Sequence, residues 1–197
     1  MKNYTHNWSG EFINNTRGIN NLDLCLEIGS FEGLTSNYIV DNILSTEGKL
    51  ICIDPLTDVY LNDNLSELDI KRNNSDFVYF KDQYSRFINN VKEHLESNKI
   101  ELVRDLSTNI FPELIKNYKN KFDFIYIDGD HRSEGVYIDA INSFELIKKG
   151  GLILFDDYLW EESNIQSTKI GIDKFLDEYS NNYRILIKSY QVLIEKL

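Results

Sequence analysis

The chain has 197 residues and a formal net charge of -11, and this length suits a single domain with a substantial buried core. The acidic balance argues against a nucleic-acid backbone or an anionic membrane as a partner. No apolar run approaches the roughly 20 residues that span a bilayer, and the polar first residues, MKNYTHNWSGEF, do not resemble a signal peptide. Because Cys25 and Cys52 both lie in apolar runs, we expect reduced thiols and a cytoplasmic location.

Short, often β-branched apolar runs alternate with helical patterns along the chain. Strands are expected over 22–29, 49–55, 99–105, 122–128 and 150–157. Helices are expected over 34–44, 83–95, 111–118 and 134–148, with a further helix at 171–179. The last two apolar runs, YRILIKSY and QVLIEKL, are too close together for a crossover, so they should pair antiparallel. This alternation predicts an α/β protein with a mostly parallel seven-stranded sheet, an antiparallel C-terminal strand, and helices on both faces.

We expect one domain over 1–197, which begins with an N-terminal arm over 1–21. Two long polar connections stand out because βα connections usually have about two to six residues. They cover 56–76, after the second strand, and 158–171, after the fifth. We interpret both as candidate lid segments; the first is equally consistent with an oligomer contact or a tolerated insertion.

Four of the five expected parallel strands end in acid. The strand ends read EIGSFEG, IDP, RDLS, IDGDH and FDDY. Open sheets of this kind bind ligands beyond the carboxyl ends of their strands. Acids repeated along this one edge therefore indicate a binding or reaction site.

The turn after the first strand, LEIGSFEGLTS, carries Glu27, Gly29 and Gly33. Glycine permits a tight turn and lets a ligand approach the backbone. The middle glycine of a dinucleotide fingerprint is missing, which disfavours a nicotinamide dehydrogenase, and an acid here suits an amino group or a sulfonium better than a pyrophosphate. Asp54 ends the second strand, where a carboxylate can accept hydrogen bonds from both ribose hydroxyls. Together these residues predict a nucleoside site.

LEIGSFEG and the following ICIDP resemble the first two motifs of class I S-adenosylmethionine-dependent methyltransferases. The segment 122–160, with FIYIDGDHRSEG and LFDDYLW, is similar to the family of macrocin-type sugar O-methyltransferases, and RFINNV resembles that family's helix before the third strand. The resemblance implies a Rossmann-like class I methyltransferase fold, S-adenosylmethionine (SAM) as cofactor, and O-methylation of a small hydroxylated acceptor such as a sugar or glycoside.

The resemblance also implies how the cofactor is held. The methionine end would face the glycine turn, its carboxylate the start of the next helix, the ribose the second strand end, and the adenine the RDLS turn. The implied cofactor-binding residues are Glu27, Gly29, Ser30, Gly33, Thr35, Asp54, Asp105, Ser107 and Asp128.

Asp128 ends the fourth strand, and Asp156 and Asp157 end the fifth. In the class I strand order these strands are neighbours, about 4.8 Å apart, so the three carboxylates should converge. Uncompensated, they would repel one another, and a hard divalent cation such as Mg²⁺ would relieve the repulsion. The resemblance implies the same acidic metal site, with Asp128, Asp156 and Asp157 as ligands.

His131 follows Asp128 by three residues, at the turn before the next helix. A neutral imidazole can take the proton of an acceptor hydroxyl, while a metal lowers the pKa of that hydroxyl. The resemblance implies that His131 is the catalytic histidine, and Asp128 and His131 are the predicted catalytic residues.

Several alternatives stay open at this point. His131 could cap a helix, and either Asp156 or Asp157 could be purely structural. Methylation of a nitrogen or of a non-sugar phenol would not require both a metal and His131. The chain could also be a methyltransferase-like domain that binds a nucleoside or glycan without turnover. A small-molecule acceptor is the expected partner, and a homo-oligomer is left open.

Overall fold

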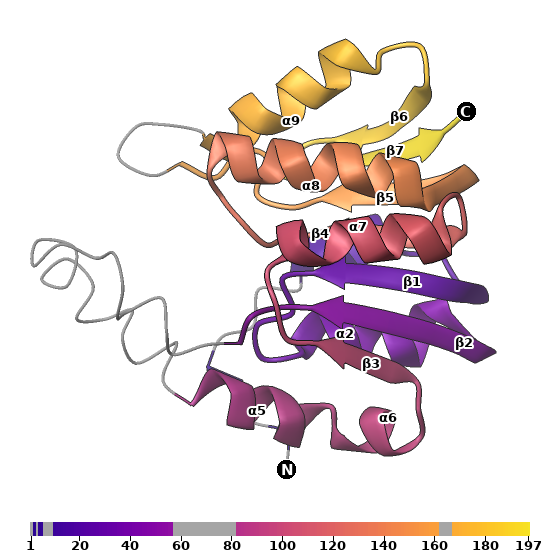
Figure 1. The fold of residues 1–197 in the computed structure, drawn as a ribbon, viewed down its shortest axis with the longest axis vertical. Coiled ribbons are helices and arrows are strands. Elements are labelled where there is room, and N and C mark those ends of the chain that lie inside the picture. Colours follow the sequence, from indigo (N-terminus) through magenta and orange to yellow (C-terminus); the bar gives the residue numbers. More distant parts are fainter. Residues whose placement is uncertain (1, 3, 6–9, 57–81, 162–166) are drawn as a thin grey trace, which may run out of the picture.

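The computed structural model describes residues 2, 4–5, 10–56, 82–161 and 167–197. Its centre is one sheet in the order β3-β2-β1-β4-β5-β7-β6 (Figure 1). The strands are β1 (Leu22–Ile28), β2 (Leu44–Ile53), β3 (Ile100–Val103), β4 (Phe122–Ile127), β5 (Ile147–Phe155), β6 (Tyr183–Lys188) and β7 (Val192–Lys196). The pairs among β1 to β5 are parallel, whereas β7 is antiparallel to both of its neighbours. The predicted mixed sheet is confirmed.

Helices cover both faces of this sheet, as predicted. The described helices are α1 (Gly10–Asn15), α2 (Leu34–Tyr38), the π-helical η1 (Ile39–Ile43), α5 (Gln83–Asn90), α6 (Lys92–Glu96), α7 (Ser107–Tyr118), α8 (Ser133–Leu146) and α9 (Ser167–Glu178). One apolar core packs α7, α8 and α9 against one face, and a second core packs α1, η1 and α5 against the other (Figure 1). The central strand β4 is buried at all six residues, which explains why FDFIYI is nearly continuously apolar.

Some element boundaries differ from the prediction for local reasons. The helix expected over 83–95 is interrupted at Val91, whose backbone (φ -106, ψ 12) is not helical. The helix expected to start at Phe111 begins at Ser107 instead, so Pro112 lies inside α7. Pro112 is the sixth residue of α7, beyond the first helical turn that proline favours.

Two predicted segments lie partly outside the described residues. Of 56–76, the structure describes only Leu56, and within 158–171 it leaves out 162–166. Residues 167–171 form the first turns of α9 rather than a connection. Among the described residues, no helix has the length and apolar character that crossing a membrane requires.

The strand register brings the carboxyl ends of the central strands level with one another. Ile28 of β1 pairs with Ile53 of β2 and with Ile127 of β4, and Ile127 pairs with Phe155 of β5. The residue after each strand therefore lies at one edge of the sheet. This edge collects the acids identified in the sequence.

Candidate functional site

The turn after β1 is packed so tightly against β4 that residue 29 must be glycine. Gly29 has a φ of 86°, and a Cβ there would lie 2.5 Å from the carbonyl carbon of Asp128 and closer still to its oxygen. Gly33 has a φ of 77°, and its Cβ would lie 2.5 Å from Cγ1 of Val91. Both glycines therefore fix the path of the turn between β1 and α2.

Asp54 holds the same turn from the end of β2. Its Oδ2 accepts hydrogen bonds from the backbone N–H groups of Ser30 and Phe31, both at 2.8 Å, and its Oδ1 accepts one from Leu56 at 2.7 Å. A carboxylate offers about four acceptor positions, so three are occupied within the protein. Burial raises the pKa of Asp54, while these N–H groups oppose the rise. About one acceptor position of Asp54 is therefore left for a ligand, and its role at the ribose hydroxyls stays a prediction.

Glu27 lies fully buried beside the turn and is only partly satisfied. Its Oε2 accepts hydrogen bonds from the Ser36 hydroxyl and, at 3.4 Å, from the Cys52 thiol. Its Oε1 is buried without a hydrogen-bond partner among the described residues. Burial raises the pKa of Glu27 to about 7. A buried carboxylate oxygen without a donor suits an incoming ammonium group, as expected for the methionine end of SAM.

Glu27→Gln is expected to stabilise the ligand-free protein above neutral pH by about 1–3 kcal/mol. Because the pKa rises from its usual 4.5 to about 7, folded Glu27 retains a proton that the unfolded chain releases between these values. The contribution to stability is therefore complete below about pH 4.5 and is lost as the pH rises through 7. Urea unfolding of variant and wild type at acidic and at alkaline pH measures this difference.

A matched control is Glu101→Gln, which removes an exposed carboxylate paired with Lys49 at 2.7 Å. We expect no comparable stabilisation from this change. Glu27→Gln should also weaken binding of S-adenosylhomocysteine (SAH), measured by calorimetry, because an amide cannot neutralise the ligand's ammonium. A Glu27→Gln protein that is less stable than wild type above pH 7 would contradict the prediction.

The residues predicted near the adenine are engaged in fixing the start of α7. Oδ1 of Asp105 accepts hydrogen bonds from the Leu106 backbone and the Asn109 side chain, both at 2.7 Å. The Ser107 hydroxyl donates to Oδ1 of buried Asp139 on α8 at 2.5 Å. Burial raises the pKa of Asp139 to about 7. Both predicted residues lie at the expected edge, but their side chains already have local partners.

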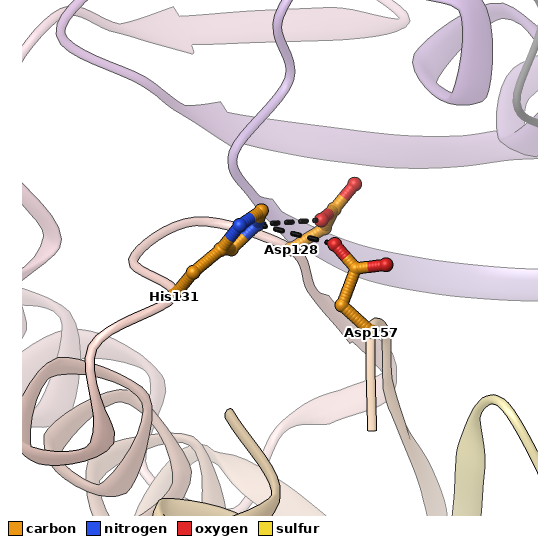
Figure 2. Close-up of side chains that lie close together, drawn as sticks. All are labelled: Asp128, His131 and Asp157. Carbon is orange, nitrogen blue, oxygen red and sulfur yellow. Dashed lines mark ion pairs between the residues drawn. The ribbon is translucent and has the colours of Figure 1, made fainter. Parts of the chain in front are cut away.

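Asp128, His131 and Asp157 converge at the ends of β4 and β5 (Figure 2). One potential ligand atom from each lies within 4.8 Å of the other two. Nε2 of His131 is 3.6 Å from Oδ1 of Asp128 and 3.3 Å from Oδ2 of Asp157. We call these three residues the Asp–His cluster.

Asp156, the third predicted metal ligand, is directed elsewhere. Its carboxylate accepts a hydrogen bond from the Tyr126 hydroxyl, which also lies 3.2 Å from Oδ2 of Asp128. Its Oδ1 accepts the backbone N–H of Asp157 at 2.7 Å. His131 thus takes the third position in the cluster. Sequence reasoning missed Tyr126 because a tyrosine inside an apolar strand is indistinguishable from a core residue.

The Asp–His cluster combines two carboxylates with an imidazole, so its charges differ from those of the three carboxylates predicted from the sequence. Burial and the charge of Asp156 raise the pKa of Asp128. Burial lowers the pKa of His131, but the contact with Asp128 and the charges of Asp128 and Asp157 outweigh it, so the pKa rises above its usual 6.5. The carboxylates therefore favour the protonated form of His131. A bound cation would displace this proton, because metal binding at such sites releases protons.

The sheet order, the glycine turn and the acidic edge together define a Rossmann-like methyltransferase fold. Residues 26–158, more than half of the chain, match a family described as "Methyltransferase domain". The chain belongs to this methyltransferase-domain family, which confirms the resemblance to class I methyltransferases; membership of the macrocin-type branch stays a prediction.

Two curated relatives and one solved structure illustrate the similarity. An uncharacterised protein of Acanthamoeba polyphaga mimivirus is 29% identical over 135 residues, covering 68% of this chain and 50% of that protein. A probable caffeoyl-CoA O-methyltransferase of Dictyostelium discoideum is 44% identical over 64 residues, covering 32% of this chain and 25% of that protein. The chain thus spans half or less of these relatives.

The solved structure is that of the O-methyltransferase TomG of Streptomyces achromogenes, involved in tomaymycin synthesis and solved in complex with SAM. It has a TM-score of 0.67 and 12% identity, and the match covers 98% of this chain and 81% of TomG. At this level of identity, the likeness concerns the fold alone.

Proposed function

We propose that the chain is a SAM-dependent O-methyltransferase that uses a divalent cation, Mg²⁺, and acts on a hydroxyl of a small acceptor. The observation that carries the proposal is the Asp–His cluster directly beside the glycine turn, where Gly29 packs against the backbone of Asp128. Family membership supports methyl transfer, and the caffeoyl-CoA relative and TomG are both O-methyltransferases by name.

The described residues around the glycine turn fit SAM, and those of the Asp–His cluster fit a divalent cation. Oε1 of Glu27, without a partner among the described residues, suits the ammonium of SAM. Ser30 lies in the glycine turn and donates its N–H to Asp54, and Thr35 is the second residue of α2, which follows the turn. The carboxylates of Asp128 and Asp157, with one oxygen of each within 4.8 Å of the other, suit a hard divalent cation, and the His131 imidazole lies beside them as the base. Asp128 and Asp157 would hold it, with Asp156 supporting Asp157 through its backbone N–H.

These positions assign a separate role to the cofactor, the cation, His131 and Glu27. SAM supplies a methyl group on a sulfonium, and the cation supplies a binding point that lowers the pKa of the acceptor hydroxyl. Asp128 and Asp157 flank Nε2 of His131, so they fix the direction in which the imidazole takes the hydroxyl proton. Glu27 and the glycine turn orient the cofactor, and this positioning supplies much of the remaining rate.

For the acceptor we propose a sugar or glycoside hydroxyl, as the resemblance of 122–160 implies. A phenol hydroxyl is the second candidate, favoured by the 44% identity to the caffeoyl-CoA O-methyltransferase relative. Product analysis with a panel of glycosides and catechols separates the two. A domain without turnover would bind SAH and methylate neither class.

Asp128→Asn is expected to reduce Mg²⁺-supported methyl transfer by about 100-fold or more, because it removes a carboxylate from the Asp–His cluster. Calorimetric titration of wild type with SAH should give one-to-one binding, and SAH release from SAM and the acceptor panel measures the transfer. No SAH binding by folded, ligand-free protein would overturn the proposed cofactor. Full methyl transfer after chelation of divalent cations would overturn the proposed cation requirement and leave the proposed SAM-dependent transfer standing.

A further inference from the structure

Asp157 adopts a backbone conformation that its neighbours must maintain. Its φ of 54° lies in the left-handed region, which residues other than glycine adopt uncommonly. Such conformations persist where surrounding contacts fix them, and they often occur at functional sites. The conformation aims Oδ2 of Asp157 at Nε2 of His131, 3.3 Å away.

The contact on the other carboxylate oxygen comes from the far end of the chain. The hydroxyl of Tyr190, in the turn between β6 and β7, donates to Oδ1 of Asp157 at 2.9 Å. The carbonyl of Tyr190 in turn accepts the backbone N–H of Tyr158 at 2.8 Å. The same residue thus holds both the side chain of Asp157 and the backbone that follows it.

The turn that carries Tyr190 is itself anchored. Its neighbour Gln191 is buried, and Oε1 of Gln191 accepts a hydrogen bond from the Asn15 side chain of α1 at 2.9 Å. The strand β7 that follows is paired with β5 on one side and β6 on the other (Figure 1). Tyr190 therefore projects from a fixed support, which a residue needs if it is to orient another.

We propose that Tyr190 is a positioning residue that occupies Oδ1 of Asp157 and so directs Oδ2 into the Asp–His cluster for cation binding. This inference rests on the proposed function, because it assigns the cluster a cation. It adds the β6–β7 turn to the site, although Tyr190 follows Asp157 by 33 residues and bears no motif. Outer partners of this kind typically change metal affinity about 10–100-fold when removed.

Tyr190→Phe removes the hydroxyl and keeps the ring, so the variant isolates the hydrogen bond. A matched control is Tyr137→Phe on α8, whose hydroxyl donates to Oε2 of Glu178 at 2.6 Å outside the site. The probes are Mn²⁺ alone, titrated into the full chain and followed by electron paramagnetic resonance, and SAH, titrated by calorimetry. We expect Tyr190→Phe to weaken Mn²⁺ binding by about 10-fold or more and to leave the affinity for SAH within about twofold of wild type. Tyr137→Phe should leave the affinities for Mn²⁺ and for SAH both within about twofold.

Three outcomes would overturn the inference. Equal Mn²⁺ affinity in Tyr190→Phe and wild type would remove Tyr190 as a positioning residue and leave the proposed function standing. Weaker binding of Mn²⁺ and SAH together, with a lower melting temperature, would show a general structural role. Absence of Mn²⁺ binding by wild type would remove the proposed cation and this inference with it.

Discussion

Replacing His131 with alanine is expected to slow methyl transfer by about 10²–10⁴-fold, the usual contribution of a positioned general base. In the described structure Nε2 of His131 lies between Asp128 and Asp157, at the sheet edge beside the glycine turn. SAH binding should stay within about twofold, because Asp54 holds the turn and Glu27 is held by Ser36, both independently of the imidazole. Release of SAH under saturating SAM and Mg²⁺ measures the transfer, and calorimetry measures the binding.

The pH profile distinguishes a base from a merely structural imidazole. The pKa of His131 is raised by Asp128 and Asp157 despite opposing burial, which favours the protonated imidazole, and this form cannot accept a proton. Wild-type kcat/KM should therefore rise with pH until His131 deprotonates, at a lower pH when the cation is bound. The residual activity of His131→Ala should lack this limb.

His94→Ala is the matched control for this substitution. Nε2 of His94 pairs with Oδ1 of Asp41 at 3.3 Å, so it is also an imidazole–carboxylate pair, but it lies on α6. We expect its transfer rate and pH profile to match the wild type. If His131→Ala gives the same result, His131 is not the base.

Much of the fold followed from short-range patterns. Alternating strands and helices predicted the parallel sheet, and the short link between the last two strands predicted their antiparallel pairing. The helix α1 was not predicted, because its sequence GEFINN buries only Phe12 and shows no apolar periodicity. Phe12 nonetheless packs edge-on against Tyr126, with ring centroids 4.6 Å apart, directly beneath the acidic edge.

The candidate site was predictable as a set of strand ends, but not as a set of side-chain directions. Parallel neighbours imply that the ends of β4 and β5 meet, which is why Asp128 and Asp157 could be placed together. That Asp157 rather than Asp156 faces His131 depends on the positive φ of Asp157 and on the Tyr126 hydroxyl, and residue spacing encodes neither. Tyr190 depends on a turn formed far along the chain, so no local pattern could identify it.

Gly29→Ala is expected to destabilise the protein by about 3 kcal/mol or more, since strain from the positive φ and overpacking each cost about 1–3 kcal/mol. The added Cβ would collide with the backbone of Asp128 and lie 2.8 Å from Cα of Gly129. The backbone on both sides of this collision is held by hydrogen bonds between strands. The Asp128 N–H donates to the carbonyl of Ile28 at 2.8 Å, and the Gly29 N–H donates to the carbonyl of Ile53 at 2.9 Å. Relief of the collision therefore requires β1 and β4 to separate at the edge that carries the Asp–His cluster.

Gly18→Ala is the control that separates the strain of a positive φ from the cost of overpacking. Gly18 has nearly the same φ, 88°, but a Cβ there meets nothing within 4 Å, so this variant should lose only the roughly 1–2 kcal/mol of left-handed strain. Urea unfolding measures both variants, and calorimetry with SAH should show weakened binding for Gly29→Ala alone. Equal losses in the two variants would mean that the turn yields without moving β4. Glycine would then be needed at position 29 only for its backbone conformation. Its packing against Asp128 would not couple the glycine turn to the Asp–His cluster.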